Sequence, residues 1–556
     1  MNKLIGRVLA TEKNPTTIDE FHFWTNSDTK LNAFDIIKVE RTDGTDTFGV
    51  IESISHITDA TSFLTNFISS DFGDVDITEP TFRVGMNYAR AKVSYNTKSD
   101  YTPVHNNSKV YLASEEEITF ALGLDKVENP LVCGSLKMYE GTEDEVTLPV
   151  KLNAKFLLGS EGAHLNISGI SGLAAKTSYA MFLMKSIQDT YATKSSDEDS
   201  VAFVLFNVKG KDLMAIDRPN DDLDEATIDA YEKLELSKTP FKQAKYYIPY
   251  FDVKSPKQST YLSRDDVSSY IDSGKLKKFK YVYEDDKESI EMMFANVEDP
   301  NQTMEAIVSK IIDEKDSDFG NLRTWAQFLE TVSENSQKGS GGAKGDISVL
   351  SWRKFKRIVN KAIKNDDMFT NRVQPEQSEC RLADELKHIK KNEIHVIDIA
   401  KLPEDKQAFV FGDAVKTIYN LKLGEYDNEG GINAPSRIVI FIDELNKYAS
   451  SDVPKNSPIL QQILDVTERG RSLGVILFGA EQFRSAIHKR VTGNCATHAY
   501  GRTNSIETST GDYRSLPDTY RNMLTRLSQG EYLIQNPVFR SLLKIKFPKP
   551  IYKQFK

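Results

Sequence analysis

Lys176 and Thr177 stand between a loop of small residues and an apolar helix pattern, in HLNISGISGLAAKTSYAMFLM at 164–184. In a phosphate-binding loop, backbone N–H groups of a strand-to-helix turn surround the phosphates, a lysine reaches the β- and γ-oxygens, and a hydroxyl binds Mg²⁺. The usual glycine spacing is not met, because Gly169 lies one position too far from Lys176 and Ala175 replaces the second glycine. An ordinary strand–turn–helix is therefore an alternative for this segment taken alone.

Two adjacent carboxylates form a second set of candidates. Ile438 to Ile442 are an apolar run that predicts a buried strand, and Asp443 and Glu444 follow at its carboxyl end. Ligand sites of open α/β sheets lie at that edge, and paired carboxylates there are costly unless they serve a cation or a reaction. A strand end that caps the next helix is the alternative. With the Lys-Thr loop upstream, the pair predicts that Asp443 holds Mg²⁺ and that Glu444 polarises the water attacking the γ-phosphate of ATP.

A third group of candidates lies in QQILDVTERGRSLGVILFGAEQF at 461–483. A helix pattern ends at Arg469 and Arg471, and a strand pattern then runs to Gln482. An arginine at such a helix end can reach a neighbouring subunit's nucleotide and neutralise charge in the transition state, while Gln482 can hydrogen-bond the γ-phosphate. The alternative for each arginine is a cation that the helix dipole favours. Spacing alone does not choose between the two.

The elements that must position these residues change character along the chain. Residues 1–155 contain short β-branched and aromatic segments with turn residues between them, including TDGTD, and predict a small β-barrel. Over 156–211 and 391–545, nearly continuous apolar runs alternate with helix patterns, which predicts an α/β domain with a largely parallel sheet. Residues 212–390 are predicted to be a mostly helical insertion, with a flexible Gly/Ser/Lys loop near 335–347.

Composition narrows the class of protein. A length of 556 residues indicates two to four domains, and 27% charged with 39% apolar residues is typical of a soluble protein. The formal charge of −10 argues against a surface that binds nucleic acid nonspecifically but allows a local basic channel. Cys133, Cys380 and Cys495 are far apart, so neither a disulfide framework nor a cysteine zinc site is expected. Without a signal segment or membrane span in the sequence, we expect a cytoplasmic protein that does not enter a membrane.

Taken together, these motifs resemble HerA-like hexameric ATPases, which are relatives of the FtsK DNA translocases. IVIFIDEL is similar to the family's Walker B strand, GRSLGVILFGAEQF to its Gly-Arg-x-x-Gly segment and sensor strand, and the β-rich N-terminus to its HAS-barrel. The end of the chain, 546–556, is similar to a tail that braces a neighbouring subunit. The resemblance implies a RecA-like P-loop ATPase core that binds ATP and Mg²⁺. The chain differs at the loop and at FNVKGKD, where family members often carry Asp in place of Asn207.

The resemblance also implies a role for each candidate. The Gly-Arg-x-x-Gly match favours Arg471 over Arg469 as the finger that acts in a neighbour's site. The catalytic candidates are Glu444, Arg471, Arg469 and Gln482, and the Mg²⁺ ligands are Thr177 and Asp443. The residues expected to hold the nucleotide are Gly169, Ser171, Gly172, Ala174, Ala175, Lys176, Thr177 and Ser178.

The same resemblance implies an ATP-driven ring motor of the DNA translocase or helicase type, a homohexamer that works on double-stranded DNA. The amino-acid sequence of the loop is similar to that of HerA proteins encoded beside effector enzymes in bacterial anti-phage systems. A separate effector, either nuclease-like or a sirtuin-like NADase, is therefore the expected partner. The alternative is a nucleotide-dependent hexameric scaffold that activates such an effector with slow or regulatory hydrolysis. Basic residues that could follow DNA phosphates, or simply form a solvated surface, are Lys338, Lys344, Arg353, Lys354, Lys356 and Arg357.

Overall fold

The structure is a computed structural model of the chain. It describes residues 3–26, 28–69, 72, 85–100, 102–159, 161–172, 175–194, 199–252, 257–338, 347–426 and 433–555. The chain forms two compact units. The first comprises 1–152, 516–523 and 532–546, and the second comprises 153–515, 524–531 and 547–556. Every helix of the described residues is too short or too polar to span a bilayer.

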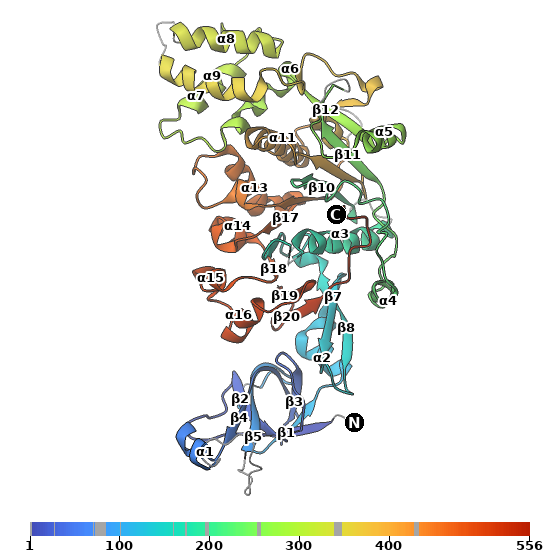
Figure 1. The fold of residues 1–556 in the computed structure, drawn as a ribbon, viewed down its shortest axis with the longest axis vertical. Coiled ribbons are helices and arrows are strands. Elements are labelled where there is room, and N and C mark those ends of the chain that lie inside the picture. The colour runs from blue at the N-terminus through green and yellow to red at the C-terminus, as the bar shows by residue number, and fades with distance from the viewer. Residues whose placement is uncertain are drawn as a thin grey trace. The chain divides into compact units, whose positions relative to one another are not determined.

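A closed barrel forms the body of the first unit (Figure 1). Its strands pair in the order β1-β2-β5-β4-β3-β6, and each neighbouring pair is antiparallel. The strands are β1 (Leu4–Leu9), β2 (Glu20–Thr25), β3 (Ile36–Glu40), β4 (Asp46–Thr58), β5 (Gly85–Asn96) and β6 (Lys109–Leu112). In β2, fully buried Phe21 and Phe23 alternate with His22 and partly exposed Trp24, so the period of two places both phenylalanines inside the barrel.

The first unit also takes in a segment from near the end of the chain. Its remaining elements are α1 (Phe63–Ser69), α2 (Glu115–Leu122), β7 (Pro130–Met138), β8 (Val146–Asn153), α16 (Asp518–Leu524), β19 (Glu531–Gln535) and β20 (Leu543–Lys546). The guanidinium of Arg540 lies 3.5 Å from the ring centroid of Tyr95 and donates to the carbonyl of Phe120 at 2.7 Å. The predicted core boundary at 391–545 therefore differs from the structure, in which 532–546 packs with the first unit.

A parallel sheet organises the second unit. Its strands follow the order β13-β12-β11-β15-β10-β16-β17-β9-β18, and each pair is parallel. The strands are β9 (Leu165–Ser168), β10 (Val201–Asn207), β11 (Ala244–Pro249), β12 (Leu276–Val282), β13 (Phe369–Thr370), β15 (Ile394–Asp398), β16 (Arg437–Asp443), β17 (Val475–Glu481) and β18 (Thr497–Tyr500). Every residue of β10 and β17 is buried, as is typical of strands covered on both faces. The predicted fold class, a RecA-like core with an N-terminal β-barrel, is confirmed.

Helices cover both faces of this sheet. Figure 1 shows β10 and β17 between α13 (Pro458–Leu473) and α3 (Lys176–Ala192). Ile438, Ile440 and Ile442 of β16 share a core with α13 and α11 (Glu404–Leu423), while α3 packs against β9, β16 and β17. Because side chains alternate along a strand, α3 lies on the opposite face. Shorter helices are α12 (Asn446–Ala449), α14 (Lys489–Asn494) and α15 (Ser505–Thr508).

The region predicted to be a mostly helical insertion, 212–390, contributes strands as well as helices. Strands β11 and β12 extend the parallel sheet beyond β15, and β14 (Glu379–Arg381) pairs with β12. The helices are α4 (Glu225–Lys233), α5 (Arg264–Asp272), α6 (Tyr283–Asp286), α7 (Thr303–Ile312), α8 (Trp325–Lys338), α9 (Val349–Ile363) and α10 (Leu382–Lys387). Most of the flexible loop predicted near 335–347 lies outside the described residues.

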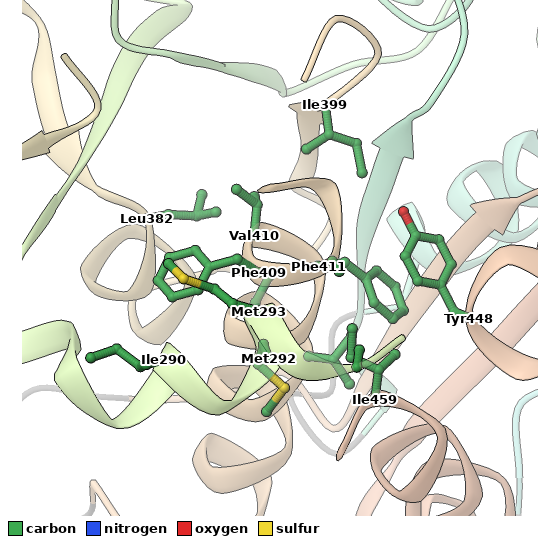
Figure 2. Packing of buried hydrophobic residues seen from close by; sticks show 14 of the residues in the cluster. Ile290, Met292, Met293, Leu382, Ile399, Phe409, Val410, Phe411, Tyr448 and Ile459 are labelled. Carbon is green, nitrogen blue, oxygen red and sulfur yellow. The ribbon is translucent and has the colours of Figure 1, made fainter. Parts of the chain in front are cut away.

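A large hydrophobic core lies on the α11 side of the sheet. Figure 2 shows Phe409 and Phe411 of α11 in one buried cluster with Met292 and Met293, which belong to a 3-10 segment at Lys287–Phe294. The rings of Phe411 and Tyr448 stack with centroids 4.4 Å apart. Tyr448 lies in α12, just after Glu444, so this packing fixes the segment that carries the two carboxylates.

Candidate functional site

The phosphate-loop candidate runs from the end of β9 to the start of α3. Gly172 and Ala175 both have left-handed backbone, with φ of +80° and +51°. Lys176 is 5% exposed, and its ammonium donates to the carbonyl of Gly169 at 2.9 Å and to Ser171 Oγ at 3.2 Å. Burial lowers the pKa of Lys176. The lysine is thus held against the first residues of the loop. Ala174 lies outside the described residues.

Thr177 and Asp443 meet although 266 positions separate them. The Thr177 hydroxyl donates to Asp443 Oδ2 at 2.9 Å, and the Glu444 N–H donates to Asp443 Oδ1 at 2.9 Å. Asp443 is 7% exposed and ends β16, and Thr177 lies in the first turn of α3. The structure therefore brings the lysine, the hydroxyl and both carboxylates to one edge of the sheet.

A hydroxyl and a carboxylate in contact fit a Mg²⁺ ion, because Mg²⁺ prefers oxygen ligands and is usually bound through one or two carboxylates plus phosphates and water. In phosphoryl-transfer sites this pairing of a loop Ser/Thr with a strand-end Asp is the usual protein contribution. Thr177 Oγ1 and Asp443 Oδ2 are the atoms that would hold the ion. These two oxygen atoms are therefore suitable ligands for Mg²⁺.

The carboxylate of Glu444 is held by two lysines that were not among the candidate residues predicted from the sequence. Its carboxylate lies 2.5 Å from Lys209 Nζ and 2.9 Å from Lys447 Nζ. Burial acts to raise the pKa of Glu444, but hydrogen bonds and charge from the two lysines outweigh it, so the pKa is lowered. The backbone of Glu444 has φ of +58°, which is uncommon for a residue other than glycine and occurs often at functional sites. The carboxylate is therefore ionised and restrained.

Glu481, rather than Gln482, is the buried residue at the end of β17. It is fully buried, and it pairs in register with Ser168 at the end of β9. Burial raises the pKa of Glu481 to about 8, while the charges of Arg484 and Lys176 act against that rise. Gln482 is half-buried just beyond the strand, and its sensor role stays a prediction.

Arg469 and Arg471 lie at the other end of the sheet from their own phosphate loop. Helix α13 ends in Gly474, which has φ of +78°, and the next residue pairs with Ile438 at the start of β16. Asp443 ends that strand five residues later, which at about 3.3 Å per residue is roughly 16 Å away. Both arginines are exposed, and Arg471 Nη1 donates to a backbone carbonyl of 161 at 3.2 Å. The structure does not bring them to the site of their own chain.

The C-terminal segment packs on its own chain beside the loop. The ring of Phe547 lies 5.1 Å from that of Tyr179 and 5.7 Å from that of Phe182, both in α3. Backbone hydrogen bonds join 218–220 to 551–553, and Gln554 Nε2 donates to Ser178 Oγ at 3.1 Å. The tail thus contacts the first turn of the helix that follows the phosphate loop. Its predicted contact with a neighbouring subunit stays a prediction.

The basic residues of α9 are mostly engaged within the chain. Arg353 Nε donates to the carbonyl of Ser336, Lys354 Nζ to that of Glu298, and Lys356 Nζ to Ser333 Oγ. These contacts accompany a buried apolar face that includes Trp352 and Phe355. They favour a structural part for these cations, whereas Arg357 is exposed. Lys344 and the side chain of Lys338 lie outside the described residues.

No protein-family model and no curated protein matches the sequence. Among solved structures, the chain is similar to the bacterial conjugative coupling protein TrwBdeltaN70, at 10% identity over 73% of this chain and 90% of that one, with a TM-score of 0.42. It is similar to VirB4 of Thermoanaerobacter pseudethanolicus at 11% identity, 76% and 96% coverage and a TM-score of 0.40. The genome packaging NTPase B204 from Sulfolobus turreted icosahedral virus 2, in complex with ATP-gammaS, is similar at 16% identity, 30% and 71% coverage and a TM-score of 0.22.

Proposed function

We propose that this chain binds and hydrolyses ATP as a HerA-like ring motor of the DNA translocase or helicase type, working with a separate effector enzyme in anti-phage defence. The observation that carries the ATPase proposal is the 2.9 Å contact between Thr177 and Asp443, with Lys176 and Glu444 beside them. The lysine, hydroxyl and paired carboxylates are the residue types that phosphoryl transfer to water needs at one point.

Each residue has a defined task in that reaction. Backbone N–H groups at the start of α3 and the Lys176 ammonium would hold the phosphates. Thr177 and Asp443 would hold Mg²⁺, which would supply positive charge that offsets the negative charge of the phosphates. The Glu444 carboxylate, whose lowered pKa keeps it ionised at neutral pH, would orient the attacking water and accept its proton.

A ring is proposed because the finger candidates lie far from the site of their own chain. Arg471 is exposed at the end of the sheet opposite Asp443, where it could face the nucleotide of the next subunit after giving up its contact with the carbonyl of Glu161. Head-to-tail contacts of this kind close into rings when the rotation between subunits is suitable. The hexameric number, the DNA substrate and the effector, nuclease-like or a sirtuin-like NADase, are inferred from the sequence resemblance.

One observation favours the alternative, a hexameric scaffold with slow or regulatory hydrolysis that activates the effector. The water-polarising carboxylate is paired with two lysines, Lys209 and Lys447, which lowers its basicity. A weakly basic carboxylate polarises water less, since general-base catalysis follows the pKa of the base.

The decisive experiment is Glu444→Gln, with the exposed Glu376→Gln as the matched control. We expect Glu444→Gln to lower the turnover of ATP by about 100-fold or more while ATP binding and the oligomeric state are kept, because only the proton acceptor is lost. The control should leave turnover unchanged. Stimulation of turnover by duplex DNA at low and moderate salt supports the motor, and its absence supports the scaffold. Turnover untouched by Glu444→Gln would refute both the motor and the assignment of the base.

A further inference from the structure

Lys209 is a second ammonium group at the proposed nucleotide site, and neither the loop motif nor the strand motif includes it. It lies two residues beyond the end of β10, and its Nζ is 2.5 Å from a carboxylate oxygen of Glu444. Its positive charge also contributes to the lowered pKa of Lys176, after burial. Lys209 therefore faces the phosphate-loop lysine and the water-polarising carboxylate at once.

The loop that presents Lys209 is fixed by a buried polar contact. Asn207 Nδ2 donates to Asp398 Oδ1 at 2.8 Å and to the carbonyl of Gly210 at 3.0 Å, and Thr260 Oγ1 donates to Asp398 Oδ2 at 2.6 Å. Both Asn207 and Asp398 are almost fully buried. An Asp in place of Asn207 would put two buried carboxylates in contact, so the amide suits this loop. The hydrogen bonds of Asn207 therefore restrain the backbone of the loop that carries Lys209.

The second lysine that pairs with Glu444, Lys447, also lines a separate pocket. Lys447 lies in α12 and lines a small pocket with Glu404, Gln407 and Ser457, on the side of α11. Lys209 and Lys447 thus each form an ion pair with the same carboxylate, and of the two only Lys209 is among the charges that act on the pKa of Lys176. Because both lysines contact the same carboxylate, a substitution at Lys447 is a suitable control for one at Lys209.

We propose that Lys209 is a γ-phosphate-binding residue whose ion pair with Glu444 must be given up when a nucleoside triphosphate binds, so that capture of Lys209 by the γ-phosphate frees the water-polarising carboxylate. This deepens the regulation of the ATPase site and rests on the function proposed above. A triphosphate carries more negative charge than the single carboxylate, and an ammonium on a flexible stem can move between the two. A diphosphate lacks the γ-oxygens and leaves the ion pair in place. The site then distinguishes ATP from ADP through one lysine.

The test is a double-mutant cycle on binding, read by calorimetric titration with a non-hydrolysable ATP analogue and with ADP. Lys209→Gln should lower the affinity for the ATP analogue by about tenfold, because the variant loses a hydrogen bond to the charged γ-phosphate. The affinity for ADP, which has no γ-phosphate, should change by no more than about twofold. Glu444→Gln should raise the affinity for the ATP analogue relative to that for ADP by about threefold, because the carboxylate that competes for Lys209 is gone. That gain should disappear in the Lys209→Gln/Glu444→Gln double variant.

Lys447→Gln is the matched control, because it removes the other ion pair of Glu444 and should leave the ratio of the two affinities unchanged. If Lys209→Gln leaves that ratio unchanged, or if the gain from Glu444→Gln persists without Lys209, the proposed exchange is wrong although the ATPase proposal stands. If the unaltered protein binds neither nucleotide, both fail. Because all readouts are equilibrium affinities, a slow rate of hydrolysis does not affect the outcome.

Discussion

At the scale of single residues, Ala175 and Glu444 share a backbone conformation that residues with a side chain rarely adopt. Their φ angles are +51° and +58°, and they flank the site from the loop side and from the strand side. Such a conformation costs an L-residue roughly 1–2 kcal/mol. The surrounding contacts must hold both residues in place, because neither is glycine. Backbone strain of this kind is often found where a site is pre-organised.

Ala175→Gly is expected to leave the melting temperature unchanged or to raise it. Glycine relieves the left-handed strain of about 1 kcal/mol, which offsets its greater freedom in the unfolded chain. The matched control is Ala180→Gly, five residues on in α3, where the residue is buried in an ordinary helix. There the same change should cost about 1 kcal/mol or more. Equal losses for the two variants in thermal denaturation would show that Ala175 is not strained.

A second residue-scale prediction concerns two buried acids in the helical layer. Burial raises the pKa of Asp413, and burial together with the charge of Asp413 raises the pKa of Asp286 to about 7, against the opposing effect of Arg381. Asp413 also accepts from Ser289 and faces the charge of Lys416. A carboxyl whose pKa is raised on folding favours the protonated form. The stability it contributes is therefore present below its ordinary pKa of 3.8 and is lost as the pH rises to about 7.

Asp413→Asn should accordingly raise the melting temperature by a few degrees at pH 8 and not at pH 4, because it removes the buried charge that develops over this range. Thermal denaturation as a function of pH measures the difference. Asp452→Asn removes a charge of the same kind from an exposed position and should be nearly neutral at both pH values. A constant difference between Asp413→Asn and the unaltered chain across the range would show that the pair does not titrate there.

How far such residues can be predicted from sequence depends on whether the local pattern fixes them. Thr177 and Asp443 were predictable, because a loop before a helix and a polar residue after a buried strand each place a side chain at the carboxyl edge of the sheet. Lys209 and Lys447 were not, because a lysine in a polar loop or short helix is usually solvated. Glu481 differs again, since it is the last residue of a strand that is buried throughout, whereas Gln482 lies just beyond that strand.

At the scale of elements, the most informative contact is between the C-terminal tail and α3. Phe547 is 6% exposed and packs against Tyr179 and Phe182, so the tail supports the helix that carries the proposed phosphate-binding residues. Phe547→Ala should destabilise the protein by about 3 kcal/mol, the lower end of the range for a buried phenylalanine. The melting temperature and the protection of α3 against hydrogen exchange should both fall. Phe63→Ala, at a side chain that is 96% exposed, is the control and should change neither.

Elements also show why part of the fold escaped prediction. Strand β12 contains Lys277, Lys278 and Lys280, which gives it the composition of a solvent-exposed segment. In the structure Lys280 Nζ lies 2.7 Å from Glu379 Oε2 of β14, and both side chains are buried. Lys280 also lies 3.8 Å from the ring centroid of Tyr250. A lysine whose ion-pair partner comes from about a hundred residues away cannot be told from a surface lysine by its local pattern. The strands β10, β16 and β17 were predictable because each consists mostly of one continuous apolar run.

At the scale of the whole molecule, the two halves of the proposed catalytic site lie at opposite edges of one parallel sheet. The phosphate loop and the carboxylates follow the carboxyl ends of β9 and β16, and Arg471 precedes the amino end of β17. Because the proposed finger lies far from the phosphate loop of its own chain, the proposed function predicts that each working site is shared by two copies of the chain.

Complementation between inactive variants tests this sharing directly. Lys176→Ala should be inactive through its loop and Arg471→Ala through its missing finger, yet a ring assembled from equal amounts of both contains interfaces with an intact loop on one side and an intact arginine on the other. Random placement makes about a quarter of the interfaces complete, so turnover of ATP should recover to about a quarter of that of the unaltered protein. A mixture of Lys176→Ala with Asp443→Ala should not recover, because both changes lie on the same side of the interface. Failure of the first mixture, in rings shown by native mass spectrometry to contain both variants, would place Arg471 outside the site altogether.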